Sequence, residues 1–168
     1  AGEHKIGKAT LRVGASDYYY YNADQYGSVA GLTTSANTPG TEFNLVEGFS
    51  TLSFTLGIPV ALNGQYVVNT DAATSEDTAY LFGTTLGKAK DKGSWEAGYN
   101  YRDTEKDAVP DGYNDSDFAH GVAGSKGHSF WTKYQLAKNL QACATYLLAK
   151  DNKDEDSDLI QLDLNFKF

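Results

Sequence analysis

Apolar and polar residues alternate strictly over the last segment of the chain, from Ser157 to Phe168. The apolar set consists of Ile160, Leu162, Leu164, Phe166 and Phe168, and the polar set consists of Gln161, Asp163, Asn165 and Lys167. Successive side chains of a β-strand point to opposite faces of its sheet, so a repeat of two residues is typical of a strand. The segment therefore predicts a strand with one apolar and one polar face.

The same alternation recurs in seven earlier segments. They are Leu11–Ser16, Leu52–Leu56, Leu62–Asn69, Tyr80–Gly87, Trp95–Arg102, Phe130–Leu136 and Gln141–Leu148. We therefore expect about eight strands in this chain. Several of them are expected to reach the roughly 9–11 residues with which a tilted strand crosses a bilayer.

The connections between these segments alternate in length. Short ones fall at Gly57–Pro59, at Lys90–Gly93 and around Asn139, whereas long polar ones cover Asn22–Gly40, Thr70–Asp77, Val109–Asp117 and Asp151–Asp156. Short turns at one rim and long loops at the other are typical of bacterial outer-membrane barrels. We predict that residues 1–168 form a single all-β domain, an antiparallel transmembrane up-and-down β-barrel with both chain ends on the short-turn side.

Aromatic residues fall where the predicted strands would meet the two membrane surfaces. Tyr18–Tyr21 suits an aromatic girdle at the outer interface, and Trp95 and Phe168 suit one at the inner interface. His4 precedes the first predicted strand and is expected to be unstructured.

The composition is compatible with a membrane barrel although the mean hydropathy is −0.48. No stretch approaches the roughly 18 apolar residues of a membrane helix. Barrel strands alternate lipid-facing and lumen-facing residues, so a spanning segment averages out as neutral or polar. Seventeen Gly, only three Pro, twelve Tyr and eight Phe favour strands over helices.

Charge and cysteine content exclude other classes of protein. The chain has 22 acidic and 14 basic residues, a net charge of −8, and no Lys/Arg-rich run, so nucleic acid is not an expected partner. The single Cys143 allows no internal disulfide and suggests packing rather than redox chemistry. The chain has no methionine and starts without an apolar leader, so we expect a processed product or a fragment.

Four stretches of the chain carry a family resemblance. They are PVALNGQYVVNTDA at 59–72, LGKAKDKGSWEAGYNYRDTEKDAVPDGYNDSDFAHG at 86–121, KGHSFWTKYQLAKNL at 126–140 and IQLDLNFKF at 160–168. In these stretches the chain resembles the C-terminal half of the putative porin family of Gram-negative-type bacteria. The resemblance implies a place in the bacterial outer membrane, within a larger barrel of about sixteen strands that leaves an aqueous channel. The implied function is passive diffusion of small hydrophilic solutes or ions.

The resemblance also implies partners. These are the lipid bilayer with its lipopolysaccharide, the transported small solutes or ions, and the barrel assembly machinery, which recognises a terminal aromatic residue such as Phe168. Porins often work as trimers, so a homotrimer is one expected assembly. No cofactor is expected.

The charged residues of the polar face are the candidate functional residues. If the apolar face meets lipid, these side chains point into the lumen: Arg12, Glu96, Arg102, Lys133, Asp163 and Lys167. In a wide barrel such charges bias which ions enter, as rings of charge do in channels. In a narrow barrel they would pair with each other and plug the interior.

Two other chemistries receive little support from the sequence. The acidic loops could offer oxygen ligands to a divalent cation, through Asp151, Asp154, Asp156 and Asp158 or through Asp111, Asp115 and Asp117. Neither fits an EF-hand loop, because from Asp154 the closing Glu position holds Asn165. A hydrolytic set drawn from His120, His128, Ser116, Ser129 and Asp117 has no G-x-S-x-G motif, so we do not expect an enzyme.

Two alternatives to the porin stay open. A small closed eight-stranded barrel would have a side-chain-filled interior and a structural, adhesion or surface-interaction role. A native mass near the 18.2 kDa of this sequence would favour it, whereas about twice that mass would favour the porin. A soluble lipocalin-type barrel would instead turn its apolar face inward.

Overall fold

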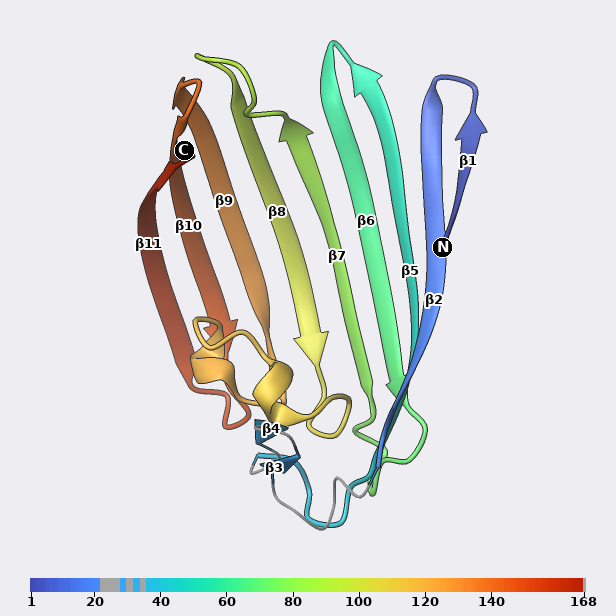
Figure 1. Cartoon of the computed structure of the whole chain (residues 1–168). Helices are drawn as coiled ribbons and strands as arrows, with labels where there is room; N and C mark the ends of the chain where they lie inside the picture. Colours follow the sequence, from blue (N-terminus) through green and yellow to red (C-terminus); the bar gives the residue numbers. More distant parts are fainter. Residues whose placement is uncertain (22–27, 30–31, 34–35, 168) are drawn as a thin grey trace.

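The computed structural model describes residues 1–21, 28–29, 32–33 and 36–167. Within these residues one antiparallel sheet contains nine strands, in the order β1-β2-β5-β6-β7-β8-β9-β10-β11. Their bounds are β1 Gly2–Ile6, β2 Ala9–Tyr20, β5 Phe43–Leu56, β6 Ile58–Asn69, β7 Thr78–Gly87, β8 Trp95–Thr104, β9 Ser125–Ala137, β10 Leu140–Lys150 and β11 Asp156–Phe166. Each strand is thus hydrogen-bonded to its sequence neighbours, which confirms the predicted all-β up-and-down topology (Figure 1).

Smaller elements lie in the long connections. Strands β3 (Ser28–Val29) and β4 (Leu32–Thr33) form a separate two-stranded hairpin between β2 and β5. Two 3₁₀ turns, η1 (Asp111–Tyr113) and η2 (Ala119–Gly121), lie in the connection between β8 and β9.

The two rims of the sheet differ as predicted. Short turns, among them the single residue Gly57 between β5 and β6, lie at the upper rim in Figure 1, and the long loops lie at the lower rim. Gly57 has a φ of 74°, a left-handed conformation that glycine adopts without a steric penalty. The long loops include residues 70–77, 105–124 and 151–155.

Two expectations about the N-terminus are wrong. His4 is not unstructured, because it lies in β1 and pairs with Leu11 of β2. β1 is therefore a ninth strand, and the described chain begins partway along the sheet rather than at the short-turn rim (Figure 1). The segment escaped prediction because its five residues contain one large apolar side chain, Ile6, which sets no alternation.

The sheet is open within the described residues. The edge strands β1 and β11 each have one hydrogen-bonded neighbour, so the predicted barrel is not closed by this part of the chain.

The strand register collects the apolar side chains on one side of the sheet, hereafter the apolar face. One row across it, at mid-height, contains Leu62, Thr84, Tyr99, Phe130, Tyr146 and Ile160. The opposite side is hereafter the polar face, and one of its rows contains Glu96, Lys133, Cys143 and Asp163. The predicted division of each strand into two faces is thus confirmed.

The small core sits at the long-loop rim, against the polar face. Phe43 and Leu45 are buried together, with Tyr20, Val67 and Val109 packed against them. A second cluster contains Phe118 and Ala119 from the loop and Leu147 and Ala149 from β10. Both clusters bury apolar side chains of the polar face beneath the loops, which explains why β5 shows no simple alternation at its start.

The aromatic run at the end of β2 is divided between the two faces. The register with β5 places Tyr18 and Tyr20 on the polar face and Tyr19 on the apolar face. Tyr20 packs against Tyr113 of η1, with ring centroids 5.4 Å apart. The prediction that the Tyr18–Tyr21 run forms an outer girdle is therefore wrong for Tyr18 and Tyr20, because neighbouring residues of a strand point to opposite faces.

Candidate functional site

An ion pair on the polar face joins two of the predicted lumen residues. Glu96 of β8 and Lys133 of β9 are directly paired in the register, and their side chains meet at 2.7 Å. Both side chains are half-buried. Along the same row lie Cys143 and Asp163, the latter accepting a hydrogen bond from Gln161 Nε2 at 3.3 Å. This row therefore carries both signs of charge across four neighbouring strands.

Arg102 lies nearer the long-loop rim, in contact with the loop between β8 and β9. Its guanidinium carbon sits 3.5 Å from the ring centroid of Phe118, a cation–π geometry. Its ion pair with Asp115 is loose, at 3.7 Å. Because the face of the guanidinium stacks on the ring, its N–H groups point along the edge, where an anion can be bound bidentately.

The loop of residues 105–124 folds over the polar face, hereafter the inward loop. Phe118 is 1% exposed and packs against Leu147 and Ala149, whose side chains belong to that face. In Figure 1 the two turns η1 and η2 lie in front of the lower ends of β8 to β10. The loop therefore covers part of the polar face, whereas sequence reasoning placed it only as an outer loop.

A buried polar network, hereafter the clasp, holds the start of the inward loop. Asp107 is fully buried, and its carboxylate accepts hydrogen bonds from Thr38 N at 2.7 Å and from Thr74 Oγ1 at 2.8 Å. Asn37 donates to the carbonyls of Lys106 and Val109 at 2.6 and 3.0 Å. Three connections, after β2, β6 and β8, are thus joined by hydrogen bonds.

The charge state of Asp107 is set by two opposing effects. Burial raises the pKa of the carboxyl group, but the hydrogen bonds from the backbone of Thr38 and from Thr74 and Thr41 lower it more. The net pKa lies below its ordinary value of 3.8, so the clasp contains a carboxylate at neutral pH.

A further carboxylate of the polar face was missed by sequence reasoning. Glu47 of β5 accepts hydrogen bonds from Ser16 Oγ at 2.9 Å and from Gln65 Nε2 at 2.6 Å. Among the described residues no cation lies within ion-pair distance of it. Counting back in twos from Thr51 and Ser53 would have assigned Glu47 to the polar face, but the strand was predicted to start only at Leu52.

The remaining predicted lumen residues differ in how firmly the structure places them. Arg12 lies on the polar face of β2, opposite Thr51, and is exposed. Lys167 comes one residue after the end of β11, with its backbone N–H bonded to Asn139 O at 2.9 Å, so the ladder assigns its side chain to neither face. Phe168 lies outside the described residues.

The structure separates two of the considered hydrolytic residues. His128 and Ser129 are neighbours in β9 and point to opposite faces, and His128 Nδ1 is 2.9 Å from Tyr99 Oη on the apolar face. Within the described residues, no three His, Cys, Asp or Glu side chains are grouped as metal ligands. Asp151 instead caps its own turn by accepting from the N–H groups of Lys153 and Glu155, which lowers its pKa.

An antiparallel up-and-down sheet with alternating faces, short turns at one rim and long loops at the other has the features of outer-membrane strands. Comparison with protein families matches residues 41–168 to the putative porin family, and the chain belongs to that family. The resemblance seen in the sequence is therefore confirmed. No curated protein and no solved structure matches the chain. No helix among the described residues is long and apolar enough to cross a membrane.

Proposed function

We propose that the chain forms part of the wall of an outer-membrane porin, through which small hydrophilic solutes and ions diffuse passively. The opposite surroundings of the two faces carry this proposal. Loops cover the polar face near the long-loop rim, whereas Leu162 of the apolar face is 77% exposed and Phe82 is 52% exposed. Soluble monomers rarely expose contiguous apolar patches of more than a few hundred Å², so a lipid environment is the natural cover for this surface.

The open edges support a larger barrel. Unpaired N–H and C=O groups cannot stay exposed in the hydrocarbon region, because each costs several kcal/mol there. The edges at β1 and β11 therefore need further strands. A wall of about sixteen strands would enclose a water-filled lumen, whereas eight strands leave no more room than their own side chains fill.

The charges of the polar face would then bias which solutes enter. The lumen wall would present Arg12, Glu96, Arg102, Lys133 and Asp163, together with Glu47. Lys167, beyond the end of β11, stays a predicted member of this set. Within this set, Glu96 and Lys133 neutralise each other, whereas Glu47 and Arg12 have no opposite charge within ion-pair distance among the described residues. We expect these two residues to act on passing ions more strongly than the paired ones.

The inward loop would narrow the lumen. Its anchor Phe118 is held between Arg102 and the β10 side chains Leu147 and Ala149, so the loop lies against the wall instead of extending outward. A constriction of this kind sets the size limit for diffusion without closing the path. Arg102, exposed along one edge of this anchor, would meet solutes at the narrowest point.

The last strand would serve membrane assembly. The alternation of β11 places Ile160, Leu162, Leu164 and Phe166 on the apolar face, and Phe168 follows as the terminal aromatic residue. We propose that the barrel assembly machinery recognises this ending and that the bilayer, with its lipopolysaccharide, surrounds the apolar face.

Planar-bilayer recording of the intact native protein tests the porin proposal. We expect stepwise conductance increases with a non-zero reversal potential in a salt gradient. Protein that inserts into the bilayer without any conductance would refute the pore.

A Phe118→Ala variant tests the constriction. Loss of the anchor frees the inward loop from the wall, so conductance per channel should rise and become noisier. Phe82→Ala is the matched control, because it removes the same ring from the apolar face and should leave conductance unchanged. Equal conductance of the Phe118 variant and the parent would mean that the inward loop does not line the path.

The second candidate, a small closed barrel with a structural or surface-interaction role, is favoured by the ion pairs on the polar face. Glu96 with Lys133 and Arg102 with Asp115 are the kind of pairs that would plug a narrow interior. The native mass separates the two: about 18.2 kDa favours the small barrel, and about twice that value favours the porin.

A further inference from the structure

In strands β7 to β11, charged residues enter the apolar face only in two adjacent rows next to the long loops. They are Asp103, Lys126, Lys150, Asp156 and Asp158. The first four form a continuous row across β8 to β11, each paired with the next in the register. Asp158 lies one row nearer the short turns, opposite Leu148. From Tyr99, Phe130, Tyr146 and Ile160 onward to the short turns, no Lys, Arg, Asp or Glu stands on this face of β8 to β11, and none stands on it in β7. The row therefore marks where the surface leaves hydrocarbon and meets headgroups.

Lys126 and Lys150 are directly opposite each other within this row. Like charges at paired positions of neighbouring strands repel and destabilise the sheet unless an anion compensates them. Gly127 keeps the strands close at this point, because a Cβ on it would collide with the carbonyl oxygen of Leu148. The two lysines thus stand on neighbouring strands at a point where the backbones approach closely.

Asp103, paired with Lys126 in the register, accepts hydrogen bonds from Tyr80 Oη and Tyr101 Oη at 3.4 Å. The other carboxylates that face these lysines compensate them weakly. Lys150 pairs with Asp156 at 3.0 Å and Lys126 with Asp154 at 3.9 Å, and both carboxylates are nearly four-fifths exposed. Ion pairs with such exposed side chains contribute about 0–1 kcal/mol to stability. An anion that reaches both lysines at once can therefore displace them.

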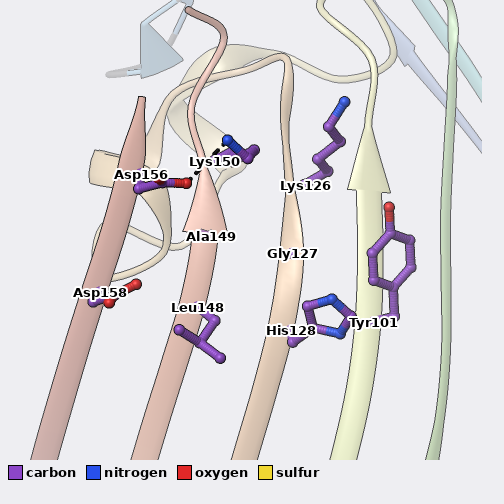
Figure 2. A pocket seen from close by; sticks show the side chains of 9 residues that line it. All are labelled: Tyr101, Lys126, Gly127, His128, Leu148, Ala149, Lys150, Asp156 and Asp158. Carbon is purple, nitrogen blue, oxygen red and sulfur yellow. Dashed lines mark ion pairs between the residues drawn. The ribbon is translucent and has the colours of Figure 1, made fainter. Parts of the chain in front are cut away.

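A pocket of about 270 Å³ lies beneath the lysines, and Figure 2 shows its lining. The pocket's side away from the loops is formed by Tyr101, His128 and Leu148, with the rings of Tyr101 and His128 5.0 Å apart, and by Asp158 opposite Leu148. The site thus has two cations at its loop edge and an aromatic and aliphatic wall toward the membrane. This combination suits a molecule with an anionic head and an acyl chain.

We propose that this pocket binds a lipid of the outer leaflet through a phosphate in its headgroup, held between Lys126 and Lys150, with an acyl chain along Leu148. Lipopolysaccharide belongs to this class of lipid. Asp156 and Asp158 line the β11 side of the pocket, so the phosphate lies over β9 and β10. The proposal depends on the membrane placement argued above and does not depend on an open pore.

Lipid retention by the intact native protein tests the site. Protein in neutral micelles is titrated with phosphatidic acid, with the diacylglycerol that has the same chains, and with inorganic phosphate, and bound molecules are counted by native mass spectrometry. We expect retention of phosphatidic acid alone. Equal retention of diacylglycerol would overturn the role of the phosphate, and binding of inorganic phosphate at the same concentration would overturn the role of the lipid.

Substitutions locate the site. Lys126→Gln and Lys150→Gln should each weaken retention on the order of tenfold, as expected for loss of one charge-assisted hydrogen bond. Asp158→Asn should strengthen retention, because it removes a repelling carboxylate. Lys5→Gln, which removes an exposed lysine from the polar face, is the charge-matched control and should have no effect.

The outcomes separate this proposal from the porin. If all four variants fold, as judged by far-UV circular dichroism, and the lysine variants retain lipid as well as the control, the site is refuted. Protein that retains phosphatidic acid through these lysines but conducts no ions would refute the pore and leave the site standing.

Discussion

Similar apolar side chains are buried on one face of the sheet and exposed on the other. Leu147, on the polar face, is 6% exposed because the inward loop covers it, whereas Ile160, on the apolar face, is 71% exposed. The loops thus supply cover where the strands are polar and leave the apolar side bare. In a water-soluble fold the reverse arrangement would bury more apolar area and be more stable. The difference is what the proposed lipid environment on one side of the sheet requires.

The largest expected effect comes from introducing an arginine at either of two neighbouring residues that point to opposite faces. Leu62 and Asn63 are adjacent in β6, at mid-height, and point to the apolar and polar faces respectively. Leu62→Arg should destabilise the protein in bilayers by about 2–4 kcal/mol, the cost of an arginine at the lipid midplane of a barrel. Asn63→Arg, facing water, should cost much less.

Urea-dependent unfolding from phosphocholine vesicles measures both free energies of unfolding. A loss for Asn63→Arg as large as that for Leu62→Arg would contradict the assignment of the two faces. It would favour the lipocalin-type arrangement, in which the apolar face is enclosed.

A substitution in the clasp is expected to have an effect of intermediate size, confined to the polar face. Asp107→Ala leaves the N–H of the partly buried Thr38 without its acceptor, at a cost of about 1–3 kcal/mol, and releases the hydroxyl of the exposed Thr74 to water. The inward loop should then open, and limited proteolysis should cleave within residues 105–124. Asp117→Ala, at an exposed position of the same loop, is the control and should not change cleavage.

The pH dependence of the clasp has a defined sign. The pKa of Asp107 is lower in the folded protein than its ordinary value of 3.8, so its contribution to stability is present above that pH and is lost as the pH falls through the folded pKa. The parent loop should therefore resist protease at neutral pH and become sensitive to an acid protease below about pH 3.8. Asp107→Asn keeps an acceptor without a charge, so its sensitivity should not change over this range.

The fold was more accessible to sequence reasoning than the site, for a physical reason. No loop covers the middle of the apolar face, so apolar side chains recur there at every second residue. This alternation identifies β2 and β5 to β11. The polar face is covered by its own loops near one rim. There the apolar residues Phe43 and Leu45 occupy polar-face positions of β5. The alternation that would have assigned Glu47 to the polar face is therefore lost.

The clasp and the inward loop could not be predicted because they depend on tertiary contacts. Asn37 and Asp107 are far apart in the sequence, and their residue types are equally typical of exposed loops. Phe118 was a loop residue without periodicity, and only its contact with Arg102 and Leu147 gives it a role. By contrast, Glu96 and Lys133 were both predicted on the polar face, and the strand register then places them opposite each other.

The smallest expected effect concerns that ion pair, and it tests whether the polar face lines a conducting path. Glu96→Gln and Lys133→Gln should each change stability by no more than about 1 kcal/mol, because the pair is partly exposed to water. Their effects on selectivity should have opposite signs. Glu96→Gln leaves an unpaired cation and shifts the reversal potential in a potassium chloride gradient toward anions, whereas Lys133→Gln shifts it toward cations. The double variant should return close to the parent, since the two charges act on each other more strongly than on passing ions. Two shifts of the same sign, or none in channels that still conduct, would place this pair away from the path of the ions.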